Sequence, residues 1–444
     1  MEKERQQFMD RVEKITEIDP SSYGAHNIKR GLRNRDGTGV LVGITNISDV
    51  VGYEVQGDKI RPREGELYIR GIGLHELIEG FQREKRFGFE EIIYLLLTGV
   101  LPNLEDLNFL QEVLWEQRVF PPYFNEDILF KNTSQNIMNM LQRAVLALYS
   151  YDDHPEDTRP SSALMKSLSL IGKLPPLMVF SYKAKRHYHD DESLIIHRGK
   201  KGGSTAENIL HLLRDNQEFT REEALLLDLL LIVHAEHGGG NNSAFATHVV
   251  SSSGTDIYSA ITTALGALKG PRHGGANLKV KEMTRFIKDN CHWKKKGEVS
   301  KILDKILKRE IYDQKGLVYG IGHAVYTKSD PRCVLLKKAA EKNAQNTKYE
   351  EDFQLLQWIE ELTIEKIQNR KGNDYAICAN VDLYSGLIYE ILGIDEQLYT
   401  PMFAISRIAG WCAHLLEQIR DEKIMRPGYV NLHHKNRYIP IKER

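Results

Sequence analysis

The chain has 444 residues, with 60 lysines and arginines against 61 aspartates and glutamates, so its formal net charge is −1. This balance excludes a global basic surface of the kind that holds nucleic acid, so an anionic substrate must be met by locally clustered arginine and histidine. The length favours two large units, or one large unit with an insertion, over a single simple core. The apolar fraction of 41% and the charged fraction of 27% are those of an ordinary soluble globular protein.

Three features of the sequence predict a cytoplasmic protein without a membrane segment. The first 14 residues are charged throughout and lack an apolar stretch, unlike a secretory signal. The most apolar run, residues 225–233, has nine residues, whereas a membrane span needs about 20. The cysteines form no C-x-x-C pair and no zinc-ribbon spacing, which predicts free thiols in a reducing compartment. They are Cys291, Cys333, Cys378 and Cys412.

The first elements in chain order are a helix and a small group of strands. Residues 1–20 predict a short polar helix. Residues 38–72 scatter β-branched and aromatic side chains among glycine and polar residues, which predicts two to four short strands with a turn at Gln56–Asp58. From about residue 74 the pattern becomes helical and remains so. The predicted fold class is therefore mostly α, with a small β element near the N-terminus.

Apolar residues spaced every 3.6 positions predict several helices, of which four are most distinct. These four helices span residues 205–214, 221–236, 255–269 and 401–420. The second is apolar almost all round, which predicts a central position. In the third, Thr255 or Asp256 is a suitable N-terminal cap, and Gly270 with Pro271 ends the helix.

A smaller, more polar helical domain is predicted between residues 278 and 375, where lysine and glutamate are frequent and aromatic residues are few. Glycine-bearing turns flank this stretch at 270–275 and 380–386. Such turns absorb changes in backbone dihedral angles, so the two turns are a plausible pair of hinges.

Four segments place histidine or aspartate beside glycine at the end of an element. Segment 234–243 reads HAEHGGGNNS, and its His234 and His237 are three residues apart. As a metal site this pair lacks a clear third ligand, and a helix end with a flexible cap is the plainer interpretation. Segment 270–277 reads GPRHGGAN, where His273 follows a helix stop and can turn its ring into a cleft, although an ordinary turn histidine fits as well.

The third and fourth segments carry a glycine loop and an isolated carboxylate. Segment 316–332 offers backbone groups to a nucleotide-like ligand, but it matches neither a P-loop nor a dinucleotide fingerprint. Its candidate residues are Gly316, Gly320, Gly322, His323 and Arg332. In segment 380–386, Asp382 stands between Val381 and Leu383, where burial raises a carboxyl pKa toward that of a carbon-acid base. The alternative for Asp382 is a cap of the following helix.

Two arginines complete the candidates. Arg407 lies inside the apolar helix 401–420 and Arg426 lies just after it; an arginine among apolar residues usually pairs with an anion. Two other segments are set aside. Residues 187–191 read HYHDD within a polar basic stretch, which predicts a solvated loop, and residues 197–203 lack phosphate-loop spacing.

Taken together, these segments resemble the citrate synthase family. The family shows H-x-D/E-H, then G-P-x-H-G-x-A-N, then G-x-G-H-x-V-x-x-x-x-D-P-R, then N-V-D-x-x-S-G, then arginine in a helix containing G-W, then R-P. All six occur here in this order, and the resemblance runs from about residue 65 to Arg426. It implies a two-domain helical fold and a homodimer. The implied divisions are an N-terminal segment 1–64, a large domain 65–275 plus 380–444, and a small domain 276–379.

The resemblance also implies roles for single residues. Asp382 would remove a proton from the methyl group of acetyl-CoA, His273 would stabilise the enol, and His323 would protonate the carbonyl of oxaloacetate. The substrate carboxylates would be held by His237, Arg332, Arg407 and Arg426, the last from the neighbouring subunit. The CoA moiety would be held by Lys315, Gly316, Gly320, Gly322 and Lys328. Many members carry a basic residue where Thr327 stands here, so Lys328 or Lys315 would have to replace it.

The implied activity is condensation of acetyl-CoA with oxaloacetate, followed by hydrolysis of citryl-CoA to citrate and CoA, with no metal or redox cofactor. A 2-methylcitrate synthase that accepts propionyl-CoA would use the same catalytic residues. A catalytically silent member that binds CoA or citrate as a regulator is an alternative of another class, and the intact trio of His273, His323 and Asp382 argues against it.

Overall fold

The computed structural model describes residues 1–444 except 35, 57–58, 373, 433–436 and 444, and the chain divides into two compact units. One unit comprises Met1–Ile44 with Met425–Arg444, and the other comprises Thr45–Ile424. The described elements of the first unit are α1 (Glu2–Thr16), α2 (Ser21–Ala25), η1 (Arg30–Leu32) and η5 (Ile441–Glu443). Helix α1 confirms the polar helix predicted within residues 1–20, and all of its side chains are exposed.

The second unit begins with a small antiparallel sheet. Its strands, in spatial order, are β1 (Ser48–Gln56), β2 (Lys59–Ile69) and β3 (Ile72–Gly73). The pairing of β1 with β2 shifts register between Val51 and Tyr53. These strands confirm the prediction of two to four strands within 38–72. Two residues of the predicted turn, Gly57 and Asp58, lie outside the described residues.

Two glycines allow this sheet to pack closely against the loop between His323 and Arg332, two of the predicted site residues. A Cβ atom on Gly52 of β1 would lie 2.7 Å from the Cα of Tyr326, and one on Gly65 of β2 would lie 3.1 Å from Cδ of Pro331. Real Cβ atoms do not come as close as 2.7 Å to a backbone atom, so a larger residue in place of Gly52 would push strand β1 away from Tyr326. The sheet therefore supports the loop between His323 and Arg332 from one side.

The rest of the second unit is helical. The helices before residue 270 are α3 (Leu74–Glu84), α4 (Phe89–Thr98), α5 (Leu104–Glu116), η2 (Asn125–Phe130), α6 (Ile137–Leu148), η3 (Tyr149–Tyr151), α7 (Pro160–His189), α8 (Thr205–Leu213), α9 (Arg221–His234), α10 (Asn242–Ser251) and α11 (Ile257–Lys269). The later ones are α12 (Ala276–Asn290), α13 (Lys296–Leu307), α14 (Pro331–Ala344), α15 (Glu350–Lys371), α16 (Asp382–Ile391), η4 (Glu396–Leu398) and α17 (Tyr399–Asp421). The fold is mostly α, as predicted.

The four most distinct predicted helices are confirmed as α8, α9, α11 and α17, with ends displaced by no more than two residues. Helix α8 begins with a capping box at Ser204, and α9 begins with one at Thr220, so side chains satisfy backbone N–H groups that the first turn leaves without partners. Asp256 caps α11, where its Oδ1 accepts a hydrogen bond of 2.8 Å from the N–H of Ser259.

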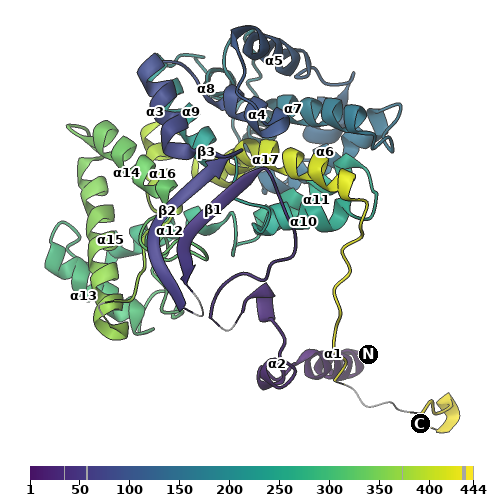
Figure 1. Ribbon diagram of the computed structural model, residues 1–444, viewed down its shortest axis with the longest axis vertical. Helices are drawn as coiled ribbons and strands as arrows, with labels where there is room; N and C mark the ends of the chain where they lie inside the picture. The colour runs from purple at the N-terminus through teal and green to yellow at the C-terminus, as the bar shows by residue number, and fades with distance from the viewer. Residues whose placement is uncertain (35, 57–58, 373, 433–436, 444) are drawn as a thin grey trace. The chain divides into compact units, whose positions relative to one another are not determined.

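Helix α17 lies at the centre of the second unit. It packs against α4, α7, α9, α10 and α11, and it crosses the middle of the unit in Figure 1. Trp411 and Arg407 of this helix are among the largest side chains that are fully buried. A buried guanidinium on a central helix requires an anion or another strong acceptor nearby, which marks this helix as part of a site.

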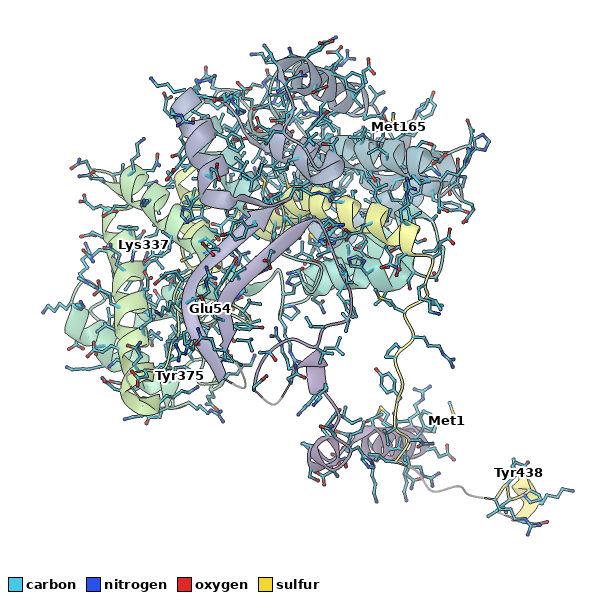
Figure 2. The ribbon with its side chains drawn as sticks, in the orientation of Figure 1. Met1, Glu54, Met165, Lys337, Tyr375 and Tyr438 are labelled. Carbon is cyan, nitrogen blue, oxygen red and sulfur yellow. The ribbon has the colours of Figure 1, made fainter. Side chains whose placement is uncertain are left out.

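Helix α7 is long and apolar enough to cross a membrane by length and composition, with a window of mean hydropathy 1.3. In the fold, 83% of that window is buried, and α7 packs against α5, α6, α8 and α17. At its margin Met165 lies at the molecular surface (Figure 2). The burial of α7 inside the fold, and not its length, distinguishes it from a membrane-spanning helix.

Helices α12 to α15 lie together with α16 at one side of the second unit (Figure 1). Helix α16 packs against α12, α14 and α15, and α13 packs against α15. Four of these helices fall within 276–379, the range predicted as a small domain. The predicted domain divisions at 64/65, 275/276 and 379/380 stay predictions.

Candidate active site

Six of the predicted catalytic and substrate-binding residues lie in the second unit, on five separate segments. The rings of His237, after α9, and His323, before α14, have centroids 5.1 Å apart. The ring of His273, between α11 and α12, is 6.2 Å from that of Phe403 on α17. The guanidinium carbon of Arg407 lies 4.8 Å from the same Phe403 ring. Loops at the ends of α9, α11 and α14 therefore converge on helix α17.

His323 is held in one orientation by its own loop. Its Nδ1 accepts hydrogen bonds of 3.0 Å from the backbone N–H groups of Val325 and Tyr326. A neutral imidazole that accepts at Nδ1 carries its proton on Nε2. That Nε2 lies 3.5 Å from Nη2 of Arg332. Because both nitrogens are donors in this arrangement, they are placed to donate together to one acceptor, such as a carbonyl or carboxylate oxygen.

Asp330 organises Arg332, which is itself buried. Its carboxylate accepts hydrogen bonds from Nε of Arg332 at 3.0 Å and from Nη2 at 2.8 Å. It also caps helix α14 and accepts from the N–H of Val381 at 3.2 Å. One carboxylate therefore fixes the guanidinium and ties it to the segment that carries Asp382.

Asp382 is the first residue of α16, and its N–H donates to Oδ1 of Asn380 at 3.1 Å. Burial raises the pKa of its carboxyl group to about 6, and Asp330 adds to this rise while Arg332 opposes it. This confirms the sequence-based expectation of a raised pKa. A carboxylate of this pKa is ionised at neutral pH, yet it is a stronger base than an ordinary aspartate.

Arg407 and His237 supply buried polar atoms that lack protein partners. Nε of Arg407 donates to the carbonyl oxygen of His234 at 2.6 Å, but Nη1 and Nη2 have no partner among the described residues, and neither has Nε2 of His237. Burial lowers the pKa of Arg407 to about 9, so it stays charged at neutral pH. Burial and the charge of Arg332 hold the pKa of His237 well below its usual value, so His237 is neutral.

His273 is neutral and is attached to a small hydrogen-bonded group. Burial, with help from the charge of Arg407, lowers its pKa to about 4. Its Nε2 lies 3.0 Å from Oγ of Ser243. This hydroxyl accepts from Nε1 of Trp411 at 3.1 Å and can donate to Oδ1 of Asn241 at 2.9 Å. A neutral imidazole fixed in this way can donate one hydrogen bond without carrying a charge.

A buried ionic group supports the His237 segment. Oε1 of Glu236 accepts from Oγ of Ser48 at 2.8 Å, from the N–H of Gly238 at 2.6 Å and from Nε2 of His414 at 3.0 Å. Nδ1 of His414 then lies 3.1 Å from Nε2 of His248. Although burial alone would raise the pKa of Glu236, His414 and these hydrogen bonds lower it to about 2.

The predicted glycine loop is joined to the Asp382 segment. The carbonyl of Gly320 accepts from the N–H of Asn380 at 2.9 Å, and that of Gly322 accepts from Nδ2 of Asn380 at the same distance. Gly320 has φ = +87°, and a Cβ there would lie 2.9 Å from Cδ1 of Leu383. Residues other than glycine rarely adopt this φ, so the close approach requires glycine.

The cationic residues predicted for CoA have ordinary surface positions. Lys328 is exposed, and Nζ of the exposed Lys315 lies 3.9 Å from a carboxylate oxygen of Asp313. The hydroxyl of Thr327 donates to the carbonyl oxygens of Gly52 and Arg63 in the sheet. Position 327 therefore anchors the loop to the strands, and the CoA roles of Lys315, Gly316, Gly320, Gly322 and Lys328 stay predictions.

Arg426 belongs to the other compact unit, Met1–Ile44 with Met425–Arg444, and its side chain is exposed. Arg426 is therefore not among the candidate site residues that lie together in the second unit. Its predicted role in the site of a neighbouring subunit stays a prediction.

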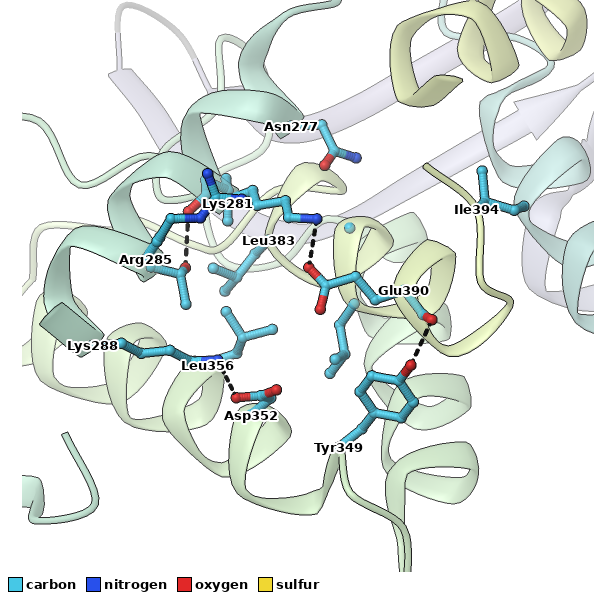
Figure 3. A pocket seen from close by; sticks show the side chains of 14 residues that line it. Asn277, Lys281, Arg285, Lys288, Tyr349, Asp352, Leu356, Leu383, Glu390 and Ile394 are labelled. Carbon is cyan, nitrogen blue, oxygen red and sulfur yellow. Dashed lines mark hydrogen bonds and ion pairs between the residues drawn. The ribbon is translucent and has the colours of Figure 1, made fainter. Parts of the chain in front are cut away.

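A cavity of about 450 Å³ lies between α12, α15 and α16, and it is lined by apolar side chains and by three cations of α12 (Figure 3). Each cation is paired with a carboxylate: Lys281 with Glu390 at 3.1 Å, Arg285 with Glu396 at 3.0 Å, and Lys288 with Asp352. Of the predicted site residues, none lines this cavity. The convergent site around Arg407 is therefore the better candidate for chemistry.

Several residues that shape the site received no role from the sequence. They are Ser243, Asp330, Tyr326, Phe403, Glu236 and His414. Asp330 was detectable in principle, because an aspartate before proline at a helix start is a common cap. Ser243 and Glu236 give no local signal for their contacts, since their partners His273 and His414 lie 30 and 178 positions away.

Known proteins resemble this chain over most of its length. The family model described as "Citrate synthase, C-terminal domain" matches residues 36–428. A citrate synthase of Deinococcus radiodurans is 33% identical over 387 residues, covering 87% of this chain and 94% of that protein. Citrate synthase 2 of Bacillus subtilis is 34% identical over 361 residues, covering 80% of this chain and 89% of that protein.

Solved structures show the same fold. The citrate synthase of Thermoplasma acidophilum, in a ternary complex with carboxymethyl coenzyme A and oxaloacetate, superimposes with a TM-score of 0.77. It is 26% identical in sequence, and the match covers 94% of this chain and 99% of that one. The architecture described above is therefore shared along nearly the whole chain.

Proposed function

Because the chain belongs to the citrate synthase family and is an acyltransferase, we propose that its site joins the methyl carbon of acetyl-CoA to the keto carbon of oxaloacetate and releases citrate and free CoA. The observation that carries the proposal is the pairing of two features. One is a partly buried carboxylate, Asp382, with its pKa raised to about 6. The other is Arg407, a buried guanidinium with two N–H-bearing nitrogens that no described residue satisfies.

The first step forms an enol from the thioester. Asp382 removes a proton from the methyl group, and neutral His273 donates a hydrogen bond to the thioester oxygen, where negative charge develops. The one proton of the Ser243 hydroxyl is shared between two acceptors within reach, Oδ1 of Asn241 and Nε2 of His273. When it turns to Nε2, the imidazole proton resides on Nδ1 and is available to the substrate. A thioester methyl group is a weak carbon acid, so both a base and an oxygen donor are required.

The second step forms the carbon–carbon bond. The enol carbon attacks the keto carbon of oxaloacetate, the thioester carbonyl re-forms and leaves its shared proton on His273, and the keto oxygen takes the proton from Nε2 of His323 to become the hydroxyl of citryl-CoA. Arg332 and Arg407 hold the carboxylates, because guanidinium groups match a carboxylate with two N–H donors. Water then attacks the thioester carbon and returns a proton to His323, and the C–S bond breaks as the leaving sulfur takes the proton held by Asp382, which releases citrate and the CoA thiol.

We also propose a cytoplasmic homodimer in which Arg426 contacts the substrate in the neighbouring subunit. Its exposure supports a contact outside its own unit, and the four free cysteines support a reducing compartment. The test mixes Arg426→Ala subunits with His273→Ala subunits after confirmed exchange. Recovered activity in the mixture supports shared sites, and absence of recovery counts against them.

The use of propionyl-CoA is the second candidate activity. The two acyl groups differ by one methylene, worth about 1–3 kcal/mol in a pocket, so the same residues serve both. The relatives named citrate synthase favour acetyl-CoA as the main substrate.

The deciding experiment measures release of the CoA thiol with oxaloacetate present, using acetyl-CoA and propionyl-CoA at matched concentrations. Turnover of acetyl-CoA that depends on oxaloacetate supports the proposal. A preference for propionyl-CoA moves the activity to 2-methylcitrate synthesis. A folded protein that releases no thiol from either substrate contradicts an enzymatic role and favours a regulator that binds CoA or citrate.

A further inference from the structure

Tyr326 lies inside the candidate site, although no pattern in the sequence singles it out. Its ring stacks on His323, with centroids 4.6 Å apart and planes inclined by 30°. It meets the ring of His237 at 5.4 Å in an edge-on arrangement, and the guanidinium carbon of Arg332 is 5.7 Å from its centre. The side chain is 3% exposed. The tyrosine therefore contacts three of the residues that would hold oxaloacetate.

The phenol oxygen of Tyr326 is buried and has no hydrogen-bond partner in the described part of the chain. The hydroxyl of a buried tyrosine that has only a structural role normally donates a hydrogen bond to an acceptor within the protein. Asp330 is close enough to act on this hydroxyl electrostatically, but its carboxylate already accepts from Arg332 through both oxygens and from the N–H of Val381. The hydroxyl is thus left as a donor inside the site.

Its protonation and its surroundings fit a role as a donor to an anion. Burial raises the pKa of Tyr326, so the phenol keeps its proton, and Arg332, Asp330 and Arg407 lie close enough to act on it electrostatically. The other buried atoms of this group without partners among the described residues are Nε2 of His237, both Nη atoms of Arg407 and one acceptor, Oε2 of Glu236. With the Tyr326 hydroxyl, four of these five atoms can donate hydrogen bonds, so the set calls for a ligand with several acceptor oxygens.

We propose that the hydroxyl of Tyr326 donates a hydrogen bond to a carboxylate oxygen of the four-carbon keto diacid, and that Tyr326 is a further substrate-binding residue. This inference rests on the proposed function. The stacked ring has a second effect, because it limits rotation of His323 about the loop that fixes its Nδ1. The sheet holds the ring in turn, since a Cβ on Gly65 would lie 2.7 Å from Cδ1 of Tyr326.

The test is Tyr326→Phe, which removes one oxygen and keeps the stacked ring. Loss of a hydrogen bond to a charged group should weaken oxaloacetate binding about tenfold or more, measured by titration calorimetry and as the KM for oxaloacetate. The KM for acetyl-CoA should stay within about twofold. The melting temperature of the ligand-free protein should be unchanged or higher, because the variant removes a buried hydroxyl that has no partner.

Tyr258→Phe is the matched control. The hydroxyl of Tyr258 is also part of a buried tyrosine, but it donates to a carboxylate oxygen of Asp152 at 2.8 Å. Its removal should therefore give the opposite result, with a lower melting temperature and unchanged binding of oxaloacetate. The two variants together separate a hydroxyl that serves the ligand from one that serves the fold.

Each outcome decides between alternatives. If the wild-type protein does not bind oxaloacetate, the proposed function fails, and the result says so independently of Tyr326. If the wild type binds oxaloacetate and Tyr326→Phe binds it equally well, the inference about Tyr326 is overturned. A marked fall in the melting temperature of ligand-free Tyr326→Phe also overturns it, because the hydroxyl would then have a partner within the fold.

Discussion

The side-chain amide of Asn277 donates a hydrogen bond of 2.6 Å to the hydroxyl of Ser385. Asn277 is the second residue of α12, just after the loop of His273, and Ser385 lies one turn into α16, which begins at Asp382. Both side chains are buried. A Cβ on Gly386 would lie 2.9 Å from Oδ1 of Asn277, so the two helices meet closely at this point. The bond therefore links the segments that carry the proposed base and the proposed enol donor.

Replacement of Asn277 by alanine should lower kcat by about 10- to 100-fold while the KM for oxaloacetate changes little. The reason is that small displacements between reacting groups reduce rates strongly, and here Asp382 would move relative to His273. Asn290→Ala, at the exposed end of the same helix, is the control and should leave kcat unchanged. An unaltered kcat in Asn277→Ala would show that the link does not position the base.

Asp382→Asn should lower kcat by about 10²- to 10⁴-fold, the usual contribution of a general base. The amide has nearly the same shape, so the circular dichroism spectrum and the melting temperature should show an intact fold. Steady-state thiol release is the measurement. Near-normal turnover would remove Asp382 as the base.

The pH dependence of kcat/KM should show a loss of activity as the pH falls through about 6. Asp382 acts in its ionised form, and burial raises its pKa to about 6, so activity is present above this pH and lost below it. His273, with a pKa of about 4, stays neutral over this range and adds no second limb near neutrality. The residual activity of Asp382→Asn should lack the limb. A profile without a limb near pH 6 would contradict the raised pKa of Asp382, because a limb near pH 4 alone is also expected from protonation of His273.

Gly410→Ala should destabilise the protein by about 1–3 kcal/mol or more, the usual cost of overpacking a core. A Cβ at this position of α17 would meet the carbonyl oxygen of Ala235 at 2.6 Å and Oε2 of Glu236 even more closely. Chemical denaturation is the measurement. Gly80→Ala is the control, because it has open space on α3 and should be stabilised by roughly 0.5–1 kcal/mol.

Glu236→Gln should destabilise the fold by about 1–3 kcal/mol at pH 7, because an amide cannot accept all the hydrogen bonds that the buried carboxylate accepts. The pKa of Glu236 falls from 4.5 to about 2 on folding, so its contribution is complete above pH 4.5 and is lost as the pH falls toward 2. The variant should therefore differ less from the wild type in acid. Glu298→Gln, in a solvent-screened pair with Lys301, is the control and should leave the stability almost unchanged. Equal losses in the two variants would contradict a special role for the buried pair.

The amino-acid sequence by itself determined the helices and supplied the candidate reacting groups. Helices α8, α9, α11 and α17 follow from apolar spacing and from caps such as Asp256, which are local properties of the chain. The proposed roles of His273, His323 and Asp382 rest on the order and spacing of motifs that resemble the citrate synthase family, because His273 and Asp382 taken singly also fit a turn and a helix cap. The length of α7, by contrast, was not apparent, since its lysines interrupt the apolar pattern before they are buried in the fold.

Only the tertiary structure decided the protonation states and the supporting contacts. The raised pKa of Asp382 has a definite value only once α16 is packed beside Asp330 and Arg332, and the lowered pKa of His273 depends on burial near Arg407. Tyr326 was hidden in the sequence because an unsatisfied hydroxyl is a property of its surroundings and not of its neighbours in the chain. Desolvation and hydrogen bonding between distant segments exist only after folding, and they convert a set of motifs into a site.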